Sequence, residues 1–321
     1  MITSGITQRI LFSPIDEGAD TLLILSGYAT PNMVSWFMKT LRERKLKPID
    51  IKLIVGMTPY DGLSISAHEG FKELYEKNYG LHISRFQCSY MFDFPVHSNL
   101  YIWTRKDIPI AAFTGSMNFM QNSFLSGRKE LAEICDPADA LIYFNEIEKN
   151  SIVCNYNGLE NYIVLKPQHV ILDEDGIPQT SFSGKGIDQI TLSLLSRNGE
   201  TGAKSGLNWG QRTKRNKNQA YIHLPRKIAE SGFFPLQKQH FTAETDDGHT
   251  LILRVEQENN KAITTPLSNA QLGEYFRYRL GLANGAYVWK QDLLNYGRTD
   301  VTFYKIDSEE FYMDFSVHTE I

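Results

Sequence analysis

The sequence predicts two domains, an α/β domain followed by a mainly-β domain. Between residues 21 and 113, short apolar runs typical of buried strands alternate with stretches of helical periodicity. Between residues 173 and 185 the chain is polar, contains glycine and lacks periodicity, as a linker does. Beyond this stretch, short strand-like runs dominate. We therefore predict domains over 1–178 and 179–321.

The first domain is predicted to hold a mostly parallel sheet flanked by helices. Apolar runs that end at turn residues predict strands over 21–25, 51–55, 81–86, 96–103 and 108–113. Apolar residues spaced three and four apart predict helices over 31–46 and 66–79. Strands and helices that alternate in this order are typical of parallel sheets covered on their faces.

The second domain is predicted to be a compact, barrel-like domain with one or two helices. Its strand candidates are 190–195, 220–224, 250–255, 286–289 and 301–306. Its helix candidates are 226–231 and 270–280. No internal repeat and no low-complexity tract interrupts either domain.

The composition excludes several classes of protein. A chain of 321 residues with 42% hydrophobic residues can build two cores. No run approaches the roughly 18 apolar residues of a membrane span, and residues 1–12 lack the pattern of a secretory signal. The three cysteines, Cys88, Cys135 and Cys154, have no metal or redox spacing, so we expect a reducing compartment, the cytoplasm.

The charge is unevenly distributed along the chain. The net charge of −4 is unfavourable for a nucleic-acid-binding protein. Residues 1–180 carry 16 basic and 21 acidic residues, whereas 181–321 carry 17 and 16. The window from Arg197 to Lys227 holds eight basic residues and one acidic residue. Because local fields govern the encounter with a polyanion, we expect this window to contact one.

Polar side chains follow two predicted strands of the first domain, in the segments V-H-S-N and F-T-G-S-M-N. His97 and Asn99 are two residues apart, so on a strand they share a face. Ser116 and Asn118 have the same spacing after the next strand. An imidazole can attack a phosphate while an amide and a hydroxyl bind its oxygens. Such side chains at adjacent strand ends can therefore surround one phosphate.

This order of residues resembles the phospholipase D superfamily, which has His-x-Lys, then Gly-Ser-x-Asn, then a glutamate. The matching residues are His97, Gly115, Ser116 and Asn118; Glu130 falls where the trailing acid stands, with Glu133 as a close competitor. The resemblance implies a phospho-histidine on His97, no metal cofactor, and a second histidine that protonates the leaving oxygen. Because the chain has one copy of the motif, it also implies a homodimer with one composite site.

The pattern departs from the superfamily at Asn99, where a lysine is expected. Loss of such a charge-stabilising group costs on the order of 10²–10³ in rate. Arg105, Lys106 or Lys129 could replace it, although none lies two residues after His97. We therefore expect Asn99→Lys to raise the cleavage rate. The alternative is a DNA-binding protein whose nuclease domain is inactivated.

Each of these residues also has an ordinary structural interpretation. A lone strand histidine is usually a hydrogen-bonded structural residue, and Gly-Ser before a helix is usually a turn and an N-cap. Asn118 alone would be a common cap. Their joint order favours the functional interpretation.

A basic segment in the second domain, 205–221, is predicted to be an arm that lies along DNA. It is polar and flexible, and Trp209 stands between glycines. Its cations would neutralise phosphates, and its amides and Arg212 could contact base edges. The residues concerned are Trp209, Gln211, Arg212, Lys214, Arg215, Asn216 and Lys217. The alternative is a solvated surface loop.

A second predicted arm spans 264–280 and contains Asn269, Arg277 and Arg279. On a helix the two arginines would face about 200° apart. We therefore expect at least one of them to be available for DNA, with a simple surface pair as the alternative.

The segments G-L-N-W-G-Q-R, Q-A-Y-I-H-L-P and L-G-E-Y-F-R-Y-R-L-G-L resemble the plant-type B-three pseudobarrel of some restriction endonucleases. With the phospholipase-D-like first domain, the whole chain is similar to the NgoFVII family, which is related to BfiI. The resemblance implies a sequence-specific endonuclease that grips double-stranded DNA with two arms. It also implies a cognate methyltransferase and, as in some relatives, a separate ATPase or helicase-type subunit. A lipid phospholipase fits poorly, because the sequence has no amphipathic membrane-binding helix.

Overall fold

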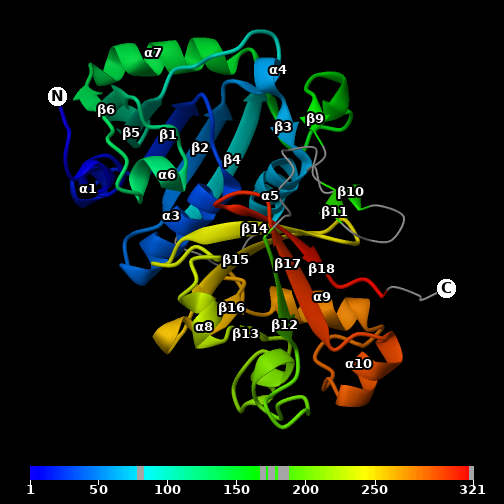
Figure 1. Cartoon of the computed structure of the whole chain (residues 1–321). Coiled ribbons are helices and arrows are strands. Elements are labelled where there is room, and N and C mark those ends of the chain that lie inside the picture. Colours follow the sequence, from blue (N-terminus) through cyan, green and yellow to red (C-terminus); the bar gives the residue numbers. More distant parts are fainter. Residues whose placement is uncertain (78–82, 167–170, 173–177, 180–187, 318–321) are drawn as a thin grey trace. The chain divides into compact units, whose positions relative to one another are not determined.

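The computed structural model describes residues 1–77, 83–166, 171–172, 178–179 and 188–317 (Figure 1). The chain forms two compact units, Met1–Pro167 and Gln168–Ile321, each with its own sheet and its own core. Most of the predicted linker lies outside the described residues; within it, β11 (Pro178–Gln179) pairs with β10 (Ile171–Leu172). No helix in the described part of the chain has the length and apolar character needed to cross a bilayer.

The first unit is built around a seven-stranded sheet with the strand order β7-β6-β5-β1-β2-β4-β8. Its strands are β1 (Thr21–Ser26), β2 (Ile49–Val55), β4 (Ile83–Met91), β5 (Leu100–Arg105), β6 (Ile108–Gly115), β7 (Ala132–Ile134) and β8 (Ser151–Val153). A separate parallel pair is formed by β3 (Leu63–Ser64) and β9 (Leu165–Lys166).

This sheet is mixed, and only its centre is parallel. Strands β1, β2 and β4 are parallel neighbours, as the alternation of strands and helices predicts. The ladders that involve β5, β6, β7 and β8 are antiparallel. A two-residue hairpin joins β5 to β6: Lys106 and Asp107 both have positive φ, 51° and 65°, as a type I′ turn requires. Because Lys-Asp is a weaker hairpin signal than Asn-Gly, the sequence alone did not indicate this reversal.

Helices cover both faces of the sheet (Figure 1). On one face α7 packs Phe144 into a cluster with Ile102. On the other face Phe37 of α3 contacts Phe119, whose ring lies near Tyr101. The helices of this unit are α1 (Ile6–Leu11), α2 (Ser13–Asp16), α3 (Pro31–Glu43), α4 (Thr58–Asp61), α5 (Ile65–Glu76), α6 (Gln121–Phe124) and α7 (Pro137–Glu148), with a 3₁₀ turn η1 (Leu159–Asn161).

The second unit is a nearly closed, barrel-like sheet with the order β12-β17-β18-β14-β15-β16-β13, whose end strands also contact each other. Its strands are β12 (Gln189–Ser193), β13 (Ile222–His223), β14 (His240–Thr245), β15 (Thr250–Glu256), β16 (Ala262–Thr264), β17 (Asp300–Lys305) and β18 (Glu310–Asp314). The rings of Phe234, Phe241, Phe303 and Phe311 meet in its core.

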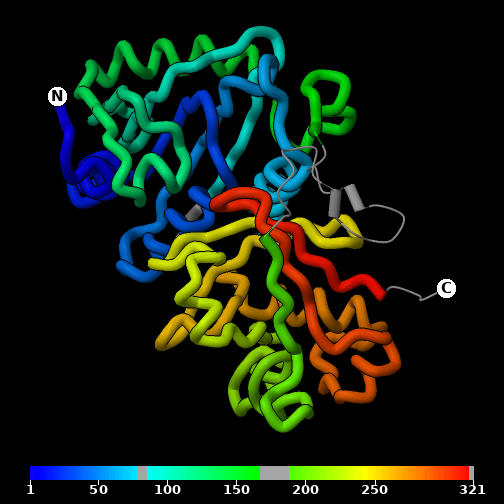
Figure 2. The backbone as a smooth tube through the Cα atoms, in the orientation of Figure 1, coloured from blue at the N-terminus to red at the C-terminus, as the bar shows by residue number. Residues whose placement is uncertain are grey.

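Three helices and two 3₁₀ turns complete the second unit: α8 (Arg226–Ala229), α9 (Gln271–Arg279), α10 (Lys290–Tyr296), η2 (Gly206–Gln211) and η3 (Glu258–Asn260). The long stretch between β12 and β13 leaves the sheet as a compact loop that includes η2, light green in Figure 2.

The structure corrects the predicted elements of this unit in two respects. Residues 286–289 form no strand, because the Asn208 side chain bonds both the N–H and the carbonyl of Val288 in place of a neighbouring strand. Strands β14, β16 and β18 and helix α10 are additional, since such short elements show little periodicity in the sequence.

Candidate active site and DNA-binding surface

The side chains predicted to surround a phosphate meet at one edge of the first sheet. The antiparallel register places the start of β5 beside the end of β1 and the end of β6. His97 and Asn99 precede β5 rather than lie on it, and Ser116 and Asn118 follow β6. These four residues therefore share the edge at which β1 ends.

His97 and Asn118 converge on Gly27, the residue that follows β1. A Cβ atom built on Gly27 would lie 2.7 Å from His97 Cδ2 and 3.4 Å from Asn118 Oδ1. His97 is exposed, so its imidazole is open to a ligand. Asn118 Oδ1 accepts from the Tyr28 N–H over 3.1 Å, while its Nδ2 has no partner among the described residues. The pair thus offers a nucleophile and an amide donor at one place.

Tyr28 fixes one side of the His97 ring. The two rings meet edge-on with 5.7 Å between their centroids. The Tyr28 hydroxyl donates to Asp61 Oδ2 over 2.5 Å, and this hydrogen bond raises the pKa of Tyr28. The phenol therefore stays protonated and anchored to Asp61 at neutral pH.

Asn99 ties three segments of this edge together and is buried, with 6% of its surface exposed. Its Oδ1 accepts from Ser26 Oγ over 3.0 Å and from the Gly27 N–H over 3.2 Å. Its Nδ2 donates to the carbonyl oxygens of Gly115 and Ser116 over 3.4 and 3.3 Å. The oxygen and the nitrogen of the Asn99 amide are thus both hydrogen-bonded within the protein. The sequence predicted only that a cation is missing at this position.

Ser116 and Glu130 are directly hydrogen-bonded. The Ser116 hydroxyl donates to Glu130 Oε2 and accepts from the Leu131 N–H over 3.0 Å. The hydroxyl that we expected on a phosphate oxygen is therefore engaged within the chain. Of the two candidate acids, Glu130 reaches the site, whereas Glu133 is exposed and lies 4.0 Å from the amine of Met1. The described residues contain no group of three or more His, Cys, Asp or Glu that could hold a metal ion.

Two of the three cations that could replace the missing lysine lie at the far end of β5. Arg105 and Lys106 contact the segment that precedes β1. Gly27 follows β1, and a six-residue strand at roughly 3.3 Å per residue separates the two ends by about 20 Å. Neither cation can therefore reach the site. Lys129 is exposed and adjoins Glu130.

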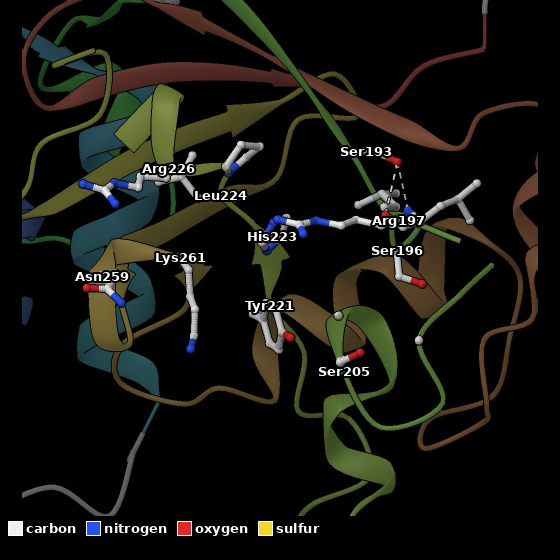
Figure 3. Close-up of a pocket in the computed structure, with 15 residues that line it drawn as sticks. Ser193, Ser196, Arg197, Ser205, Tyr221, His223, Leu224, Arg226, Asn259 and Lys261 are labelled. Carbon is white, nitrogen blue, oxygen red and sulfur yellow. Dashed lines mark hydrogen bonds between the residues drawn. The ribbon is translucent and has the colours of Figure 1, made fainter. Parts of the chain in front are cut away.

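The second unit contains a pocket of about 660 Å³ at the base of the β12–β13 loop (Figure 3). Arg197, Arg226 and Lys261 line it, and none of the described lining residues is a carboxylate. Arg226 pairs with Glu230 over 2.7 Å, and in Figure 3 the Arg197 side chain extends toward His223. Burial and then the nearby Arg197 lower the pKa of His223, so its imidazole is neutral at neutral pH and can both accept and donate.

Arg197 and Arg226 lie near the ends of the basic window predicted from the charge distribution, but no lining residue is among the individual side chains named as DNA contacts. The lining comes from four stretches of the chain, 193–197, 202–206, 221–226 and 259–261, which no sequence pattern brings together. The sequence gives one indication of the last stretch, 259–261, which is a turn. Gln257, Asn259 and Asn260 have positive φ, and E-N-N between two strand-like runs is typical of a turn.

The predicted basic arm is an exposed loop with a fixed base. Its exposed residues are Arg212, Lys214, Arg215, Asn216 and Lys217. The Arg215 guanidinium lies 4.3 Å from the ring centroid of Trp209, which meets Tyr221 edge-on. Gln211 is half-buried and donates to the Gly285 carbonyl over 3.0 Å, so its amide is used in the base of the loop.

The second predicted arm belongs to the core instead. Arg277 is fully buried and donates to four backbone carbonyls, those of Leu207, Lys217, Gly273 and Ala286. Arg279 pairs with Asp246 and Asp247 over 2.6 and 3.2 Å. Asn269 is half-buried, and its carbonyl accepts from the Ala220 N–H. The structure does not leave either arginine free as expected, because backbone carbonyls bind Arg277 on one side of α9 and two aspartates pair with Arg279 on another.

Comparisons with known proteins agree with the arrangement of the two units. Residues 4–161 match the NgoFVII restriction endonuclease N-terminal PLD domain, and residues 182–307 match the NgoFVII C-terminal B3-like DNA-binding domain. No curated protein matches the chain.

Two solved structures resemble the chain at low identity. NucT from Helicobacter pylori is 15% identical, covering 47% of this chain and 96% of its own, with a TM-score of 0.31. Polyphosphate kinase from Porphyromonas gingivalis is 14% identical, covering 45% of this chain and 20% of its own, with a TM-score of 0.28. At these TM-scores neither likeness supports an assignment of activity. The domain matches do span most of the sequence, and the chain belongs to the NgoFVII restriction endonuclease family, with a phospholipase-D-like first domain and a B3-like second domain.

Proposed function

We propose that the chain is a restriction endonuclease that cleaves double-stranded DNA at a specific sequence, with His97 as its nucleophile. The observation that supports this most is the convergence of His97 and Asn118 on Gly27, within a restriction endonuclease domain. The exposed imidazole can reach a phosphorus atom while Asn118 Nδ2 donates to one of its oxygens.

The proposed reaction has two steps and uses no metal. A ring nitrogen of His97 attacks phosphorus, the bond to the leaving oxygen breaks, and that oxygen takes a proton from a second histidine. Water then attacks the phospho-histidine, gives its proton back to the second histidine and releases His97. Asn99 and Glu130 hold the site through Gly27 and Ser116.

The second histidine has no candidate in the described part of the first unit, because His68 is buried and bonded to Tyr90. A homodimer would supply it from the partner. Three exposed apolar side chains around the site fit such a contact. Phe94 lies three residues before His97, Leu131 follows Glu130, and the Tyr143 hydroxyl lies 3.1 Å from Ser98 Oγ.

The second unit is the proposed recognition module. The pocket cations Arg197 and Lys261 would bind phosphates, and the exposed loop would continue that surface. Trp209, Lys214, Arg215, Asn216 and Lys217 belong to this surface, with Gln211 and Asn269 at its base. If Arg212 contacts a base, Arg212→Ala weakens binding to the target by about 1–3 kcal/mol and spares random DNA. A cognate methyltransferase and a separate ATPase subunit follow from the family resemblance alone.

The test is incubation of the purified protein with plasmid DNA in EDTA. Discrete fragments support the endonuclease, and specific DNA retention without cutting supports the inactivated DNA-binding protein instead. His97→Ala should abolish cutting and leave the affinity for the target unchanged. Cutting by this variant would exclude His97 as the nucleophile.

A further inference from the structure

Among the described residues, none of the side chains that meet at the proposed active site carries a fixed positive charge. The side chains that meet at the site are a neutral amide on Asn118, an imidazole on His97 and a carboxylate on Glu130. Phosphoryl transfer places negative charge on the oxygens of the phosphorus, and a fixed cation there stabilises the transition state. Asn99 cannot supply it, and Arg105 and Lys106 lie at the other end of the sheet.

The segment between α6 and β7 carries the two cations that remain close to the site, Arg128 and Lys129. It is attached to the site at Glu130, which bonds Ser116, and at the next residue, whose N–H bonds the same hydroxyl. Its other end is fixed by Ser126 Oγ, which donates to the Asn122 carbonyl and accepts from the Arg128 N–H over 3.1 Å. The backbone of Arg128 is therefore held two residues from a side chain of the site.

The alternation of side chains decides between the two cations. Residues 128–131 run without helix or turn into β7, and in an extended chain residues two apart share a face. Burial follows this alternation from residue 130 to residue 133, although Ile134 at the end of β7 is exposed. Glu130 is half-buried and Ala132 is buried, whereas Leu131 and Glu133 are exposed. Arg128 and Lys129 are both exposed, and we infer from the two-residue spacing that Arg128 shares the face of Glu130 and that Lys129 lies on the opposite face.

Nothing in the described chain neutralises Arg128. Its side chain is exposed and has no ion pair or hydrogen bond with another described residue. The adjoining Gly127 has open space around its Cα, since a Cβ built there would meet nothing within 4 Å. A guanidinium at this position is free to turn toward a ligand held between His97 and Asn118.

We propose that Arg128 is a catalytic residue that donates two N–H groups to the non-bridging oxygens of the scissile phosphate. It would supply the charge that a lysine at position 99 supplies elsewhere in the superfamily, from a different segment of the chain. Arginine suits this role because its planar fork matches two phosphate oxygens at once. The inference rests on the proposed nuclease function and names one further residue of that site.

The test compares Arg128→Ala with Lys129→Ala, which removes the same charge one residue away. Single-turnover cleavage of target DNA at saturating protein should fall by about 10²–10³ for Arg128→Ala. It should stay at the wild-type rate for Lys129→Ala. The affinity for target DNA should fall only slightly and by a similar factor in both variants, because each loses one exposed cation while the proposed recognition residues of the second unit are unchanged. Arg128→Lys, which keeps the charge without the fork, should be intermediate.

A sulfur substitution at a non-bridging oxygen of the scissile phosphate reports the contact directly. It should slow the wild-type protein and add little to the defect of Arg128→Ala. Equal losses in the Arg128 and Lys129 variants, or wild-type cleavage by Arg128→Ala, would overturn the assignment. A wild-type protein that does not cut its target would instead overturn the nuclease function itself, so the two failures are distinguishable.

Discussion

Replacing Asn99 with alanine tests whether this residue maintains the active-site edge. The change removes the acceptor of the buried Gly27 N–H and the donor to two carbonyl oxygens. An orphaned buried donor costs about 1–3 kcal/mol, and each long Nδ2 contact contributes about 0.5 kcal/mol. Together these predict a loss of about 2–4 kcal/mol in the free energy of unfolding.

The measurement is urea and thermal unfolding of the whole chain, with the exposed Asn155→Ala as the matched control. At about 2–4 °C per kcal/mol, the first unit should melt roughly 4–16 °C lower in Asn99→Ala. The control should be unchanged. A change in Asn99→Ala below about 0.5 kcal/mol, as for an ordinary surface residue, would refute the argument.

The same contacts change what we expect of Asn99→Lys. A lysine ammonium can donate to the carbonyls of Gly115 and Ser116, but it offers no acceptor to the Gly27 N–H. We therefore expect this variant to be less stable than the wild type, and any gain in cleavage rate to be limited by the displaced Gly27. A stable and faster Asn99→Lys would show that the site prefers the ammonium.

Three further predictions follow from the geometry. Gly27→Ala should push the His97 ring aside and lower cleavage by about 10²-fold, whereas Gly127→Ala, which meets open space, should cut normally in the same assay. Arg277→Ala should cost about 3–5 kcal/mol of stability, measured by urea unfolding, because four carbonyls, two of them in buried hydrogen bonds, lose their donor. Burial lowers the folded-state pKa of His68 below its unfolded value of about 6.5, so the unfolded chain binds the proton more readily and stability falls as pH drops through about 6.5. Unfolding at pH 7 and pH 5 should therefore show a smaller loss of stability for His68→Gln than for the wild type; equal losses would contradict this assignment.

Sequence reasoning recovered the features that depend on local spacing. The five longest strands of the first unit overlap the predicted apolar runs, whereas β3, β7, β8 and β9, each of two or three residues, were not predicted. The meeting of His97 with Asn118 follows from their positions at adjacent strand ends. The partners of Asn99 could not be predicted, because three of them are backbone groups, of Gly27, Gly115 and Ser116, and the fourth is the hydroxyl of Ser26, which no sequence pattern links to position 99. The same holds for Arg277, whose partners are four carbonyls from separate segments.

The pocket of the second unit could not be predicted for a related reason. A run of cations in one segment, as in 212–217, is visible in the sequence. The pocket formed by Arg197, His223 and Lys261 is not, because closure of the barrel brings together stretches of the chain that are far apart. The position of Arg128 likewise depends on a face of the sheet, which only the observed burial of Glu130 and Ala132 defines.

The attachment of Arg277 to the β12–β13 loop has a consequence for how this family can change its target. Arg277 donates to the carbonyls of Leu207 and Lys217, which flank the exposed stretch. The two ends of this stretch are therefore held in fixed positions. The side chains of Arg212, Arg215 and Asn216 contact other residues of the same loop, so a substitution there changes the loop before it changes the barrel. If the proposed function holds, the loop can diversify while the scaffold stays constant.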